Sequence, residues 1–197
     1  MRSNNFLIFF ILIINLFSIN HSNSIEADVF VQSTVNRASQ ALSNKFSKEE
    51  KIRKLKDIAN ETVDISGIGS YTLGSYRKNI NVEQKKEYQI LFKQYFLKSF
   101  SSRLAEYSNP EIQVVSRKKL NENYTIVFSK LVATDQRPEV KIDWRIYTKD
   151  PKNLLIRDLI IEGLSLARTQ KEEFASIIES NNGDINALFV TLKKFIN

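Results

Sequence analysis

The sequence predicts an α+β fold: a curved four-stranded antiparallel sheet covered by helices from both termini, in a single domain with an apolar cavity between sheet and helices. Two observations lead to this prediction. Residues 111–161 alternate apolar and polar side chains with a period of two, and short polar turns interrupt the alternation, which is typical of a meander. The segments on either side repeat apolar residues at helical spacing instead. A sheet with one apolar face needs a cover, and these flanking helices would supply it.

The strand expected at residues 140–147 shows the alternation most clearly. One face would carry Val140, Ile142, Trp144 and Ile146, and the other Lys141, Asp143, Arg145 and Tyr147. A turn at residues 149–153 contains Asp, Pro and Asn, and a strand rich in Leu and Ile follows it to residue 161. We therefore expect the apolar side of this strand, with the only Trp of the chain, to face the covering helices.

Besides a short helix within residues 64–76, three longer helices are expected before the sheet. The first spans residues 28–42, and the second spans 48–61 after a capping box that starts at Ser47. The third runs from a cap at Asn81 to about residue 107, is apolar on two sides and is rich in aromatic side chains. A helix that is apolar on two sides is expected to lie between other elements rather than at the surface, and we expect the apolar face of the sheet to face this helix.

Residues 64–76 hold three of the five glycines and differ from the helices around them. Asp64 is expected to cap a short helix, and Gly74 to end it in the left-handed conformation. Glycine within a helix costs on the order of 1 kcal/mol. Close packing of another element would explain why glycine is tolerated here, and so would a mobile segment beside a cavity.

Two more helices are expected after the sheet. A capping box at residues 169–172 would open the first of them, and Gly183 would end it. Asp184 would then cap the last helix.

Residues 1–24 have the layout of a secretory signal peptide. Arg2 gives a positive start, residues 6–17 are apolar apart from Asn15, and residues 22–24 are a small-residue cleavage site. The apolar core is short for a membrane span, although an uncleaved anchor is the alternative. The domains expected are a signal peptide at 1–24 and one domain at 25–197.

The composition excludes several classes of site. The chain has no Cys, and its single His is His21, within the expected signal peptide. A mature chain without either residue has no Ser-His-Asp or Cys-His nucleophile and lacks the usual zinc, copper and haem ligands. The formal net charge of +7 fits an acidic partner or anionic lipid, or simply solvated helix faces, because the basic residues are scattered.

Several motifs, taken in order, resemble the MlaC family, the periplasmic phospholipid-binding components of MCE-type ABC transport systems, also called toluene-tolerance auxiliary proteins. No single motif is specific, but their order extends over nearly all of the expected mature chain. Tyr76 stands where many members have Trp. The matching residues are Asp64, Leu73-Gly74, Tyr76-Arg77, Gln84, Phe92, Tyr107, Asp143-Trp144-Arg145, Asp158, residues 162–166, residues 168–174 and Gly183-Asp184.

The resemblance implies a soluble, non-catalytic shuttle of the periplasm that helps to maintain outer-membrane lipid asymmetry. Its partners would be a phospholipid, an inner-membrane ABC transporter with an MCE-domain ring, and an outer-membrane lipoprotein complex. No cofactor, metal or nucleic acid is expected. Under this hypothesis the acyl tails would contact Tyr71, Leu73, Phe92, Tyr95, Phe96, Phe128, Trp144, Ile146 and Leu166. Arg77 and Arg145 would lie near the headgroup, although a structural ion pair is the alternative role for each.

Two other hypotheses remain open at this point. One is a periplasmic adaptor or chaperone with a dry core and a basic partner-binding surface. The other is an enzyme that uses carboxylates, for which Asp143 and Asp158 are the strand acids available. Asp143 alternates onto the face away from Trp144, which argues against it.

Overall fold

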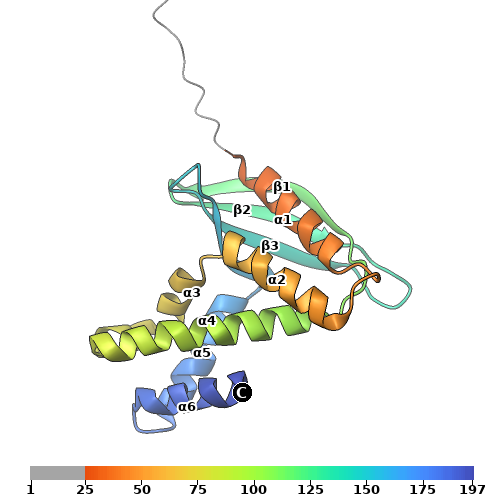
Figure 1. The fold of residues 1–197 in the computed structure, drawn as a ribbon. Coiled ribbons are helices and arrows are strands. Elements are labelled where there is room, and N and C mark those ends of the chain that lie inside the picture. The colour runs from red at the N-terminus through yellow and green to blue at the C-terminus, as the bar shows by residue number, and fades with distance from the viewer. Residues whose placement is uncertain (1–24) are drawn as a thin grey trace, which may run out of the picture.

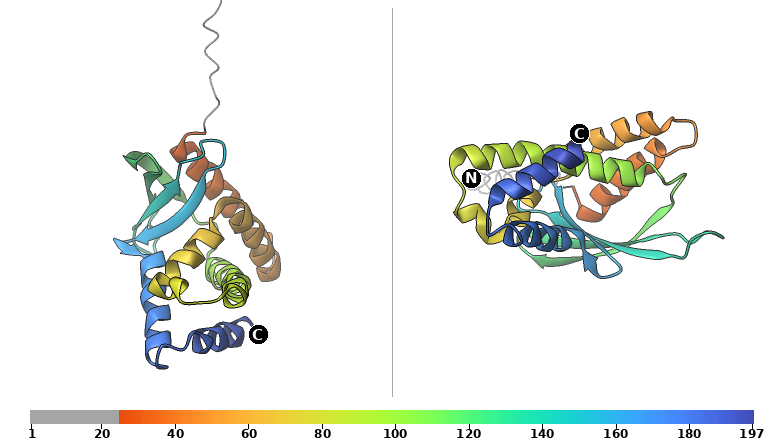
Figure 2. Two further views of the ribbon diagram at one scale, coloured as in Figure 1. Left: turned by 90° about the vertical axis from the view of Figure 1, so that its left-hand side faces the viewer. Right: turned by 90° about the horizontal axis from the view of Figure 1, so that it is seen from below.

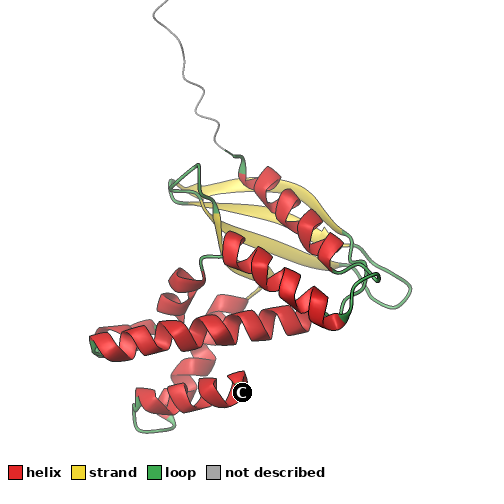
Figure 3. Cartoon of the chain, viewed as in Figure 1, coloured by secondary structure: helices red, strands yellow, loops and turns green. Residues whose placement is uncertain are grey.

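The computed structural model describes residues 25–197 and has the expected α+β architecture (Figures 1 and 3). The helices are α1 (Ala27–Ala41), α2 (Lys48–Thr62), α3 (Ile65–Thr72), the 3-10 helix η1 (Gly74–Lys78), α4 (Val82–Leu104), α5 (Leu166–Glu179) and α6 (Ile185–Ile196). The strands are β1 (Ile112–Asn121), β2 (Tyr124–Leu131), β3 (Val140–Tyr147), β4 (Leu155–Ile161) and β5 (Leu164–Ser165). The expected signal peptide lies outside the described residues. Among residues 25–197, no helix has the length and apolar character needed to cross a membrane.

The sheet is an antiparallel meander in the order β1-β2-β3-β4-β5. The prediction of four strands is wrong by one, because β5 has only two residues and is too short to show an alternation. Strand β1 forms one edge and has register shifts near Ser116 and after Lys119. Val127, Trp144 and Leu159 are aligned across β2, β3 and β4, so the apolar side chains of the meander share one face.

Helix α1 covers that apolar face (Figure 1). Trp144 is 9% exposed and packs in a core to which α1 contributes Ala27, Val31 and Val35. The indole N–H donates a 2.8 Å hydrogen bond to the Ser129 hydroxyl, which in turn donates to a main-chain carbonyl of β3. The polar part of Trp144 is thus satisfied inside an otherwise apolar core.

The aromatic helix α4 lies in a different core. It packs against α2, α3 and α6, and its aromatic side chains join a helical core built from α3, α4, α5 and α6 (Figure 2). We expected the apolar face of the sheet to face this helix, and that expectation is wrong, because α1 occupies the face instead. Tyr88 is buried in the helical core and shares a 2.8 Å hydrogen bond with Thr72, and burial raises the pKa of Tyr88, so its hydroxyl stays neutral.

Most of the predicted helix caps are present. Ser47 and Asn81 form reciprocal capping boxes, and Asp64 caps α3. The cap predicted at Thr169 is wrong: α5 begins one turn earlier with Ser165 as its cap, and Thr169 lies inside the helix. Its hydroxyl donates to the Ser165 carbonyl, so the residue follows the helix rather than starting it.

Candidate functional site

A pocket of about 330 Å³ lies at one end of the sheet, on the face opposite to α1. Helix α3 forms one wall, the turn between β1 and β2 forms another, and β3, β4 and the start of α5 complete it. It is lined by Gly67, Ile68, Tyr71, Leu120, Asn121, Tyr124, Arg145, Arg157, Asp158 and Ala167.

A β-bulge in β4 makes this lining possible. Arg145 pairs with Asp158 and the next residue of β3 pairs with Ile156, so Arg157 is left without a partner in the register. Neighbouring residues of a regular strand point to opposite faces. A bulge changes this alternation and is a common means of re-aiming a side chain. Here it lets the consecutive residues Arg157 and Asp158 both line the pocket.

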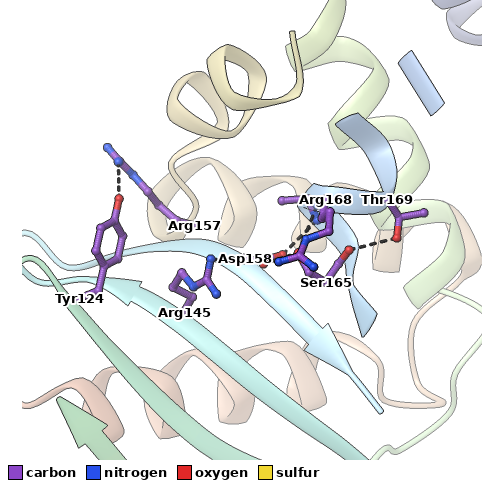
Figure 4. Close-up of polar contacts among 8 residues, drawn as sticks. Tyr124, Arg145, Arg157, Asp158, Ser165, Arg168 and Thr169 are labelled. Carbon is purple, nitrogen blue, oxygen red and sulfur yellow. Dashed lines mark hydrogen bonds and ion pairs between the residues drawn. The ribbon is translucent and has the colours of Figure 1, made fainter. Parts of the chain in front are cut away.

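Asp158 fastens the start of α5 to the sheet. Its carboxylate is 4% exposed and accepts hydrogen bonds from the Ser165 hydroxyl at 2.6 Å and from the Ala167 main-chain N–H at 3.0 Å (Figure 4). A negative group at a helix N-terminus is favoured by the unpaired N–H groups and the helix dipole. Each carboxylate oxygen therefore accepts a hydrogen bond that holds α5 in place, and this leaves Asp158 poorly suited to acid–base chemistry.

Arg145 is the least engaged charged group of the pocket. Its guanidinium lies 3.9 Å from Asp158, longer than a hydrogen bond, and its side chain is 42% exposed. Its Nε is buried and has no hydrogen-bond partner among the described residues. Figure 4 shows Arg145 between the Tyr124–Arg157 pair and the Asp158–Ser165 pair. A guanidinium has five donors, so Arg145 retains capacity for an anionic ligand.

Arg157 is held much more firmly. It donates to the Asp64 carboxylate at 2.6 Å and to the Tyr124 hydroxyl at 2.8 Å, and its guanidinium lies 4.0 Å from the centre of the Tyr147 ring. Partial burial of the guanidinium would lower its pKa, but the hydrogen bonds to Tyr124 and Asp64 outweigh burial and raise the pKa of Arg157. Arg157 thus remains charged.

The apolar part of the pocket is continuous with the helical core. Ile68 and Ala167 line the pocket and also belong to the buried cluster that contains Phe92 and Phe174. The contact behind this wall is tight, because a Cβ at Gly69 would lie 2.7 Å from the Phe92 ring. The glycine of this segment therefore permits close packing of α3 on α4, the first of the two explanations that the sequence left open.

The site combines cations, an apolar wall and little free acid or base. Among residues 25–197, no group of three or more His, Cys, Asp or Glu is placed to hold a metal ion. The arrangement is suited to holding a molecule with an anionic group and an apolar part.

A model of the MlaC protein family matches residues 31–194, most of the chain. The chain belongs to the MlaC family. Among the solved structures, the chain is similar to a phospholipid-binding protein from Ralstonia solanacearum in complex with a phospholipid. The match has a TM-score of 0.73 and 18% sequence identity and covers 87% of this chain and 97% of that one. No curated protein matches the chain.

The MlaC fold separates the residues predicted to contact a ligand into distinct environments. Tyr71 and Arg145 line the pocket. Leu73 and Phe92 are buried in the helical core, and Tyr95 and Phe96 pack against it. Trp144 and Ile146 are buried in the core that α1 covers, and Phe128 is half-buried on β2. Leu166 is exposed at the start of α5, and Arg77 is exposed in η1.

Of the ten residues that line the pocket of this MlaC chain, the sequence predicted Tyr71 and Arg145 and missed the other eight, among them Leu120, Tyr124, Arg157 and Asp158. Arg157 and Asp158 interrupt an apolar strand, and two adjacent charges in a buried strand are the signal that a bulge was present. Leu120 and Tyr124 flank a polar turn, and nothing in their spacing distinguishes them from ordinary hairpin residues.

Replacing Asp158 with alanine is expected to destabilise this MlaC protein by about 2–3 kcal/mol, because the Ser165 hydroxyl and the Ala167 N–H at the start of α5 lose a charged acceptor. Asp158→Asn should lose less, since the amide oxygen still accepts from Ala167. Urea unfolding followed by circular dichroism measures both. Equal losses for the two variants would contradict this account of the carboxylate.

Proposed function

We propose that this protein binds a phospholipid in the pocket and carries it between membrane complexes without catalysing a reaction. The observation that carries the proposal is that one pocket combines the Arg145 guanidinium, whose Nε has no hydrogen-bond partner among the described residues, with an apolar wall that belongs to the helical core. Membership of the MlaC family and the phospholipid bound by the Ralstonia solanacearum protein support the choice of ligand.

The chemistry of the pocket fits an amphipathic ligand. A phosphate offers oxygen acceptors to a guanidinium in a bidentate arrangement, and Arg145 has donors to spare. Tyr71 and Leu120 are exposed apolar groups at the same site, where they would cover the first part of an acyl chain. Each buried methylene gains about 0.8 kcal/mol, so a long tail supplies most of the affinity.

The tails require more room than the pocket has. Its volume of about 330 Å³ is near the lower end of the range for sites that hold drug-sized molecules. We infer that the tails extend past Ile68 and Ala167 into the helical core, where Leu73, Phe92, Tyr95 and Phe96 would contact them. Trp144, Ile146, Phe128 and Leu166 stay predicted contacts, and the Trp144→Ala variant below tests the first of them.

The transport role is proposed from the family. The protein would act in the periplasm after removal of residues 1–24, and would exchange lipid with an inner-membrane ABC transporter that carries an MCE-domain ring. An outer-membrane lipoprotein complex would be the second partner. The positive net charge of the chain is compatible with acidic partner surfaces at either membrane.

Native mass spectrometry tests the ligand directly. Protein purified from membranes of the expressing cell should carry a mass that corresponds to a phospholipid, and lipid-free protein should acquire the same mass from phospholipid vesicles. Absence of lipid in both experiments would reject the carrier function.

Arg145→Gln should weaken phospholipid uptake by about five- to tenfold, the effect of losing roughly 1 kcal/mol of charge-assisted hydrogen bonding at a half-exposed site. Arg117→Gln is the matched control: Arg117 is similarly exposed, but it pairs with Glu26 and Asp28 on the α1 side of the sheet. Titration of each variant with fluorescent phospholipid measures the effect. Equal affinities for Arg145→Gln and the wild type would remove Arg145 from the headgroup site.

A second candidate function is an adaptor or chaperone with a dry core. The tight filling of the helical core, in which the Phe92 ring packs against both Tyr88 and Phe174, is the observation that favours it. This function predicts no lipid in the mass spectrum together with stable capture of a protein partner.

A further inference from the structure

A single carboxylate joins the pocket wall α3 to the sheet. One oxygen of Asp64 accepts a 2.8 Å hydrogen bond from the Gly67 N–H and so caps α3. The other oxygen accepts a 2.6 Å hydrogen bond from Nε of Arg157 and forms an ion pair with its Nη2, also at 2.6 Å. The side chains of Asp64 and Arg157 are 15% and 32% exposed, so the pair is partly shielded from water.

Arg157 is a fixed anchor for this carboxylate. The bulge directs it to the pocket face, the Tyr147 ring lies against its guanidinium, and the Tyr124 hydroxyl accepts a hydrogen bond from its Nη1. Gly67 is part of the same arrangement, because a Cβ there would overlap the Asp64 carboxylate. Arg157 and Gly67 also line the pocket, so a ligand would lie beside the pair.

The stability of helix α3 depends on contacts with other elements, such as this ion pair. It has eight residues, two of them glycine, and glycine lowers helix stability by about 1 kcal/mol each. It separates the pocket from the helical core, because Ile68 belongs to both. Its start is tied to β4 by the ion pair and by the hydrogen bond from the Asp64 N–H to the Ile156 carbonyl.

We propose that the Asp64–Arg157 pair is a latch and that α3 is the gate between the pocket and the helical core. A lipid phosphate in the pocket competes with Asp64 for Arg157, the start of α3 is released from β4, and a tail passes Ile68 into the core. When the lipid leaves, Asp64 returns to Arg157 and the gate closes. This inference rests on the proposed binding of phospholipid.

The test uses Asp64→Asn, which keeps an oxygen to cap α3 but removes the charge of the latch. Amide hydrogen exchange of lipid-free protein should show residues 68–72 exchanging about tenfold faster in this variant than in the wild type. Release of a fluorescent phosphatidylglycerol to acceptor vesicles should also be about tenfold faster. Glu139→Gln is the control, because it breaks the exposed pair with Lys130 at a distance from α3 and should change neither rate.

Arg157→Lys is the second variant, and it keeps the charge but loses the planar fork and the stacking on Tyr147. Like Asp64→Asn, it should make amide hydrogen exchange in α3 faster than in the wild type. In the wild type, loading with phosphatidylglycerol should accelerate exchange of the α3 N-terminus, whereas millimolar inorganic phosphate should not. An equal effect of inorganic phosphate would overturn the assignment to lipid.

The outcomes separate the latch from the proposed function. Unchanged α3 exchange in both variants would overturn the latch even if the wild type binds lipid. If the wild type takes up no lipid, the carrier function fails and the lipid step of the latch fails with it. Amide hydrogen exchange in the lipid-free variants would then still show whether the Asp64–Arg157 ion pair stabilises α3.

Discussion

Phe92→Ala is expected to lower the free energy of unfolding by about 3–5 kcal/mol. Phe92 is 2% exposed and lies at the centre of the helical core, with ring-centre distances of 5.7 Å to Tyr88 and 6.2 Å to Phe174. Removing the ring loses its transfer free energy and leaves a cavity beneath α3, which packs closely on the ring at Gly69. Urea unfolding of lipid-free protein measures the loss.

The same variant also tests whether tails reach the helical core. A ligand that fills the vacated volume stabilises the native state, so the loss should be smaller in lipid-loaded than in lipid-free protein. Phe92→Leu, which removes less volume, should fall between the wild type and Phe92→Ala in both states. An identical loss with and without lipid would indicate that the tails stop short of Phe92.

Trp144→Ala is expected to cost a similar 3–5 kcal/mol, for a different reason. The variant empties part of the α1 core and leaves the Ser129 hydroxyl without its donor. Because Trp144 points away from the pocket that Arg145 lines, the folded fraction should keep its lipid stoichiometry. Thermal unfolding with native mass spectrometry at a permissive temperature measures both quantities. A loss of lipid from the folded fraction would instead assign Trp144 to the tail site, as the sequence predicted.

Local signals in the sequence were sufficient for most of the fold. The alternation around Trp144 identified β3, and the side chains of Ser47, Asn81 and Asp64 identified three helix starts, because a cap acts within a single turn. The start of α5 was misplaced, since Ser165 acts there together with Asp158 from another strand, and no local pattern contains that contact.

The hydrophobic periodicity of the sequence could not show which element packs against each apolar face. Hydrophobic spacing shows that β3 and α4 each bury a face, but it does not show which element covers which. Trp144 therefore appeared to face Phe92, while the structure pairs Trp144 with α1 and Phe92 with α3, α5 and α6. The pocket was missed in part for the same reason, because Arg157 lines it only through a bulge that shifts the register of β4 against β3.

The edge formed by β1 has a consequence for the behaviour of the protein at high concentration. An unpaired strand edge invites the addition of a strand from another molecule and is a common start of aggregation. Here the irregular register of β1 would interrupt such a pairing, and the exposed residues Lys118 and Lys119 would bring like charges together. Residues that contribute little to the cores would thus keep the sheet from growing beyond one molecule.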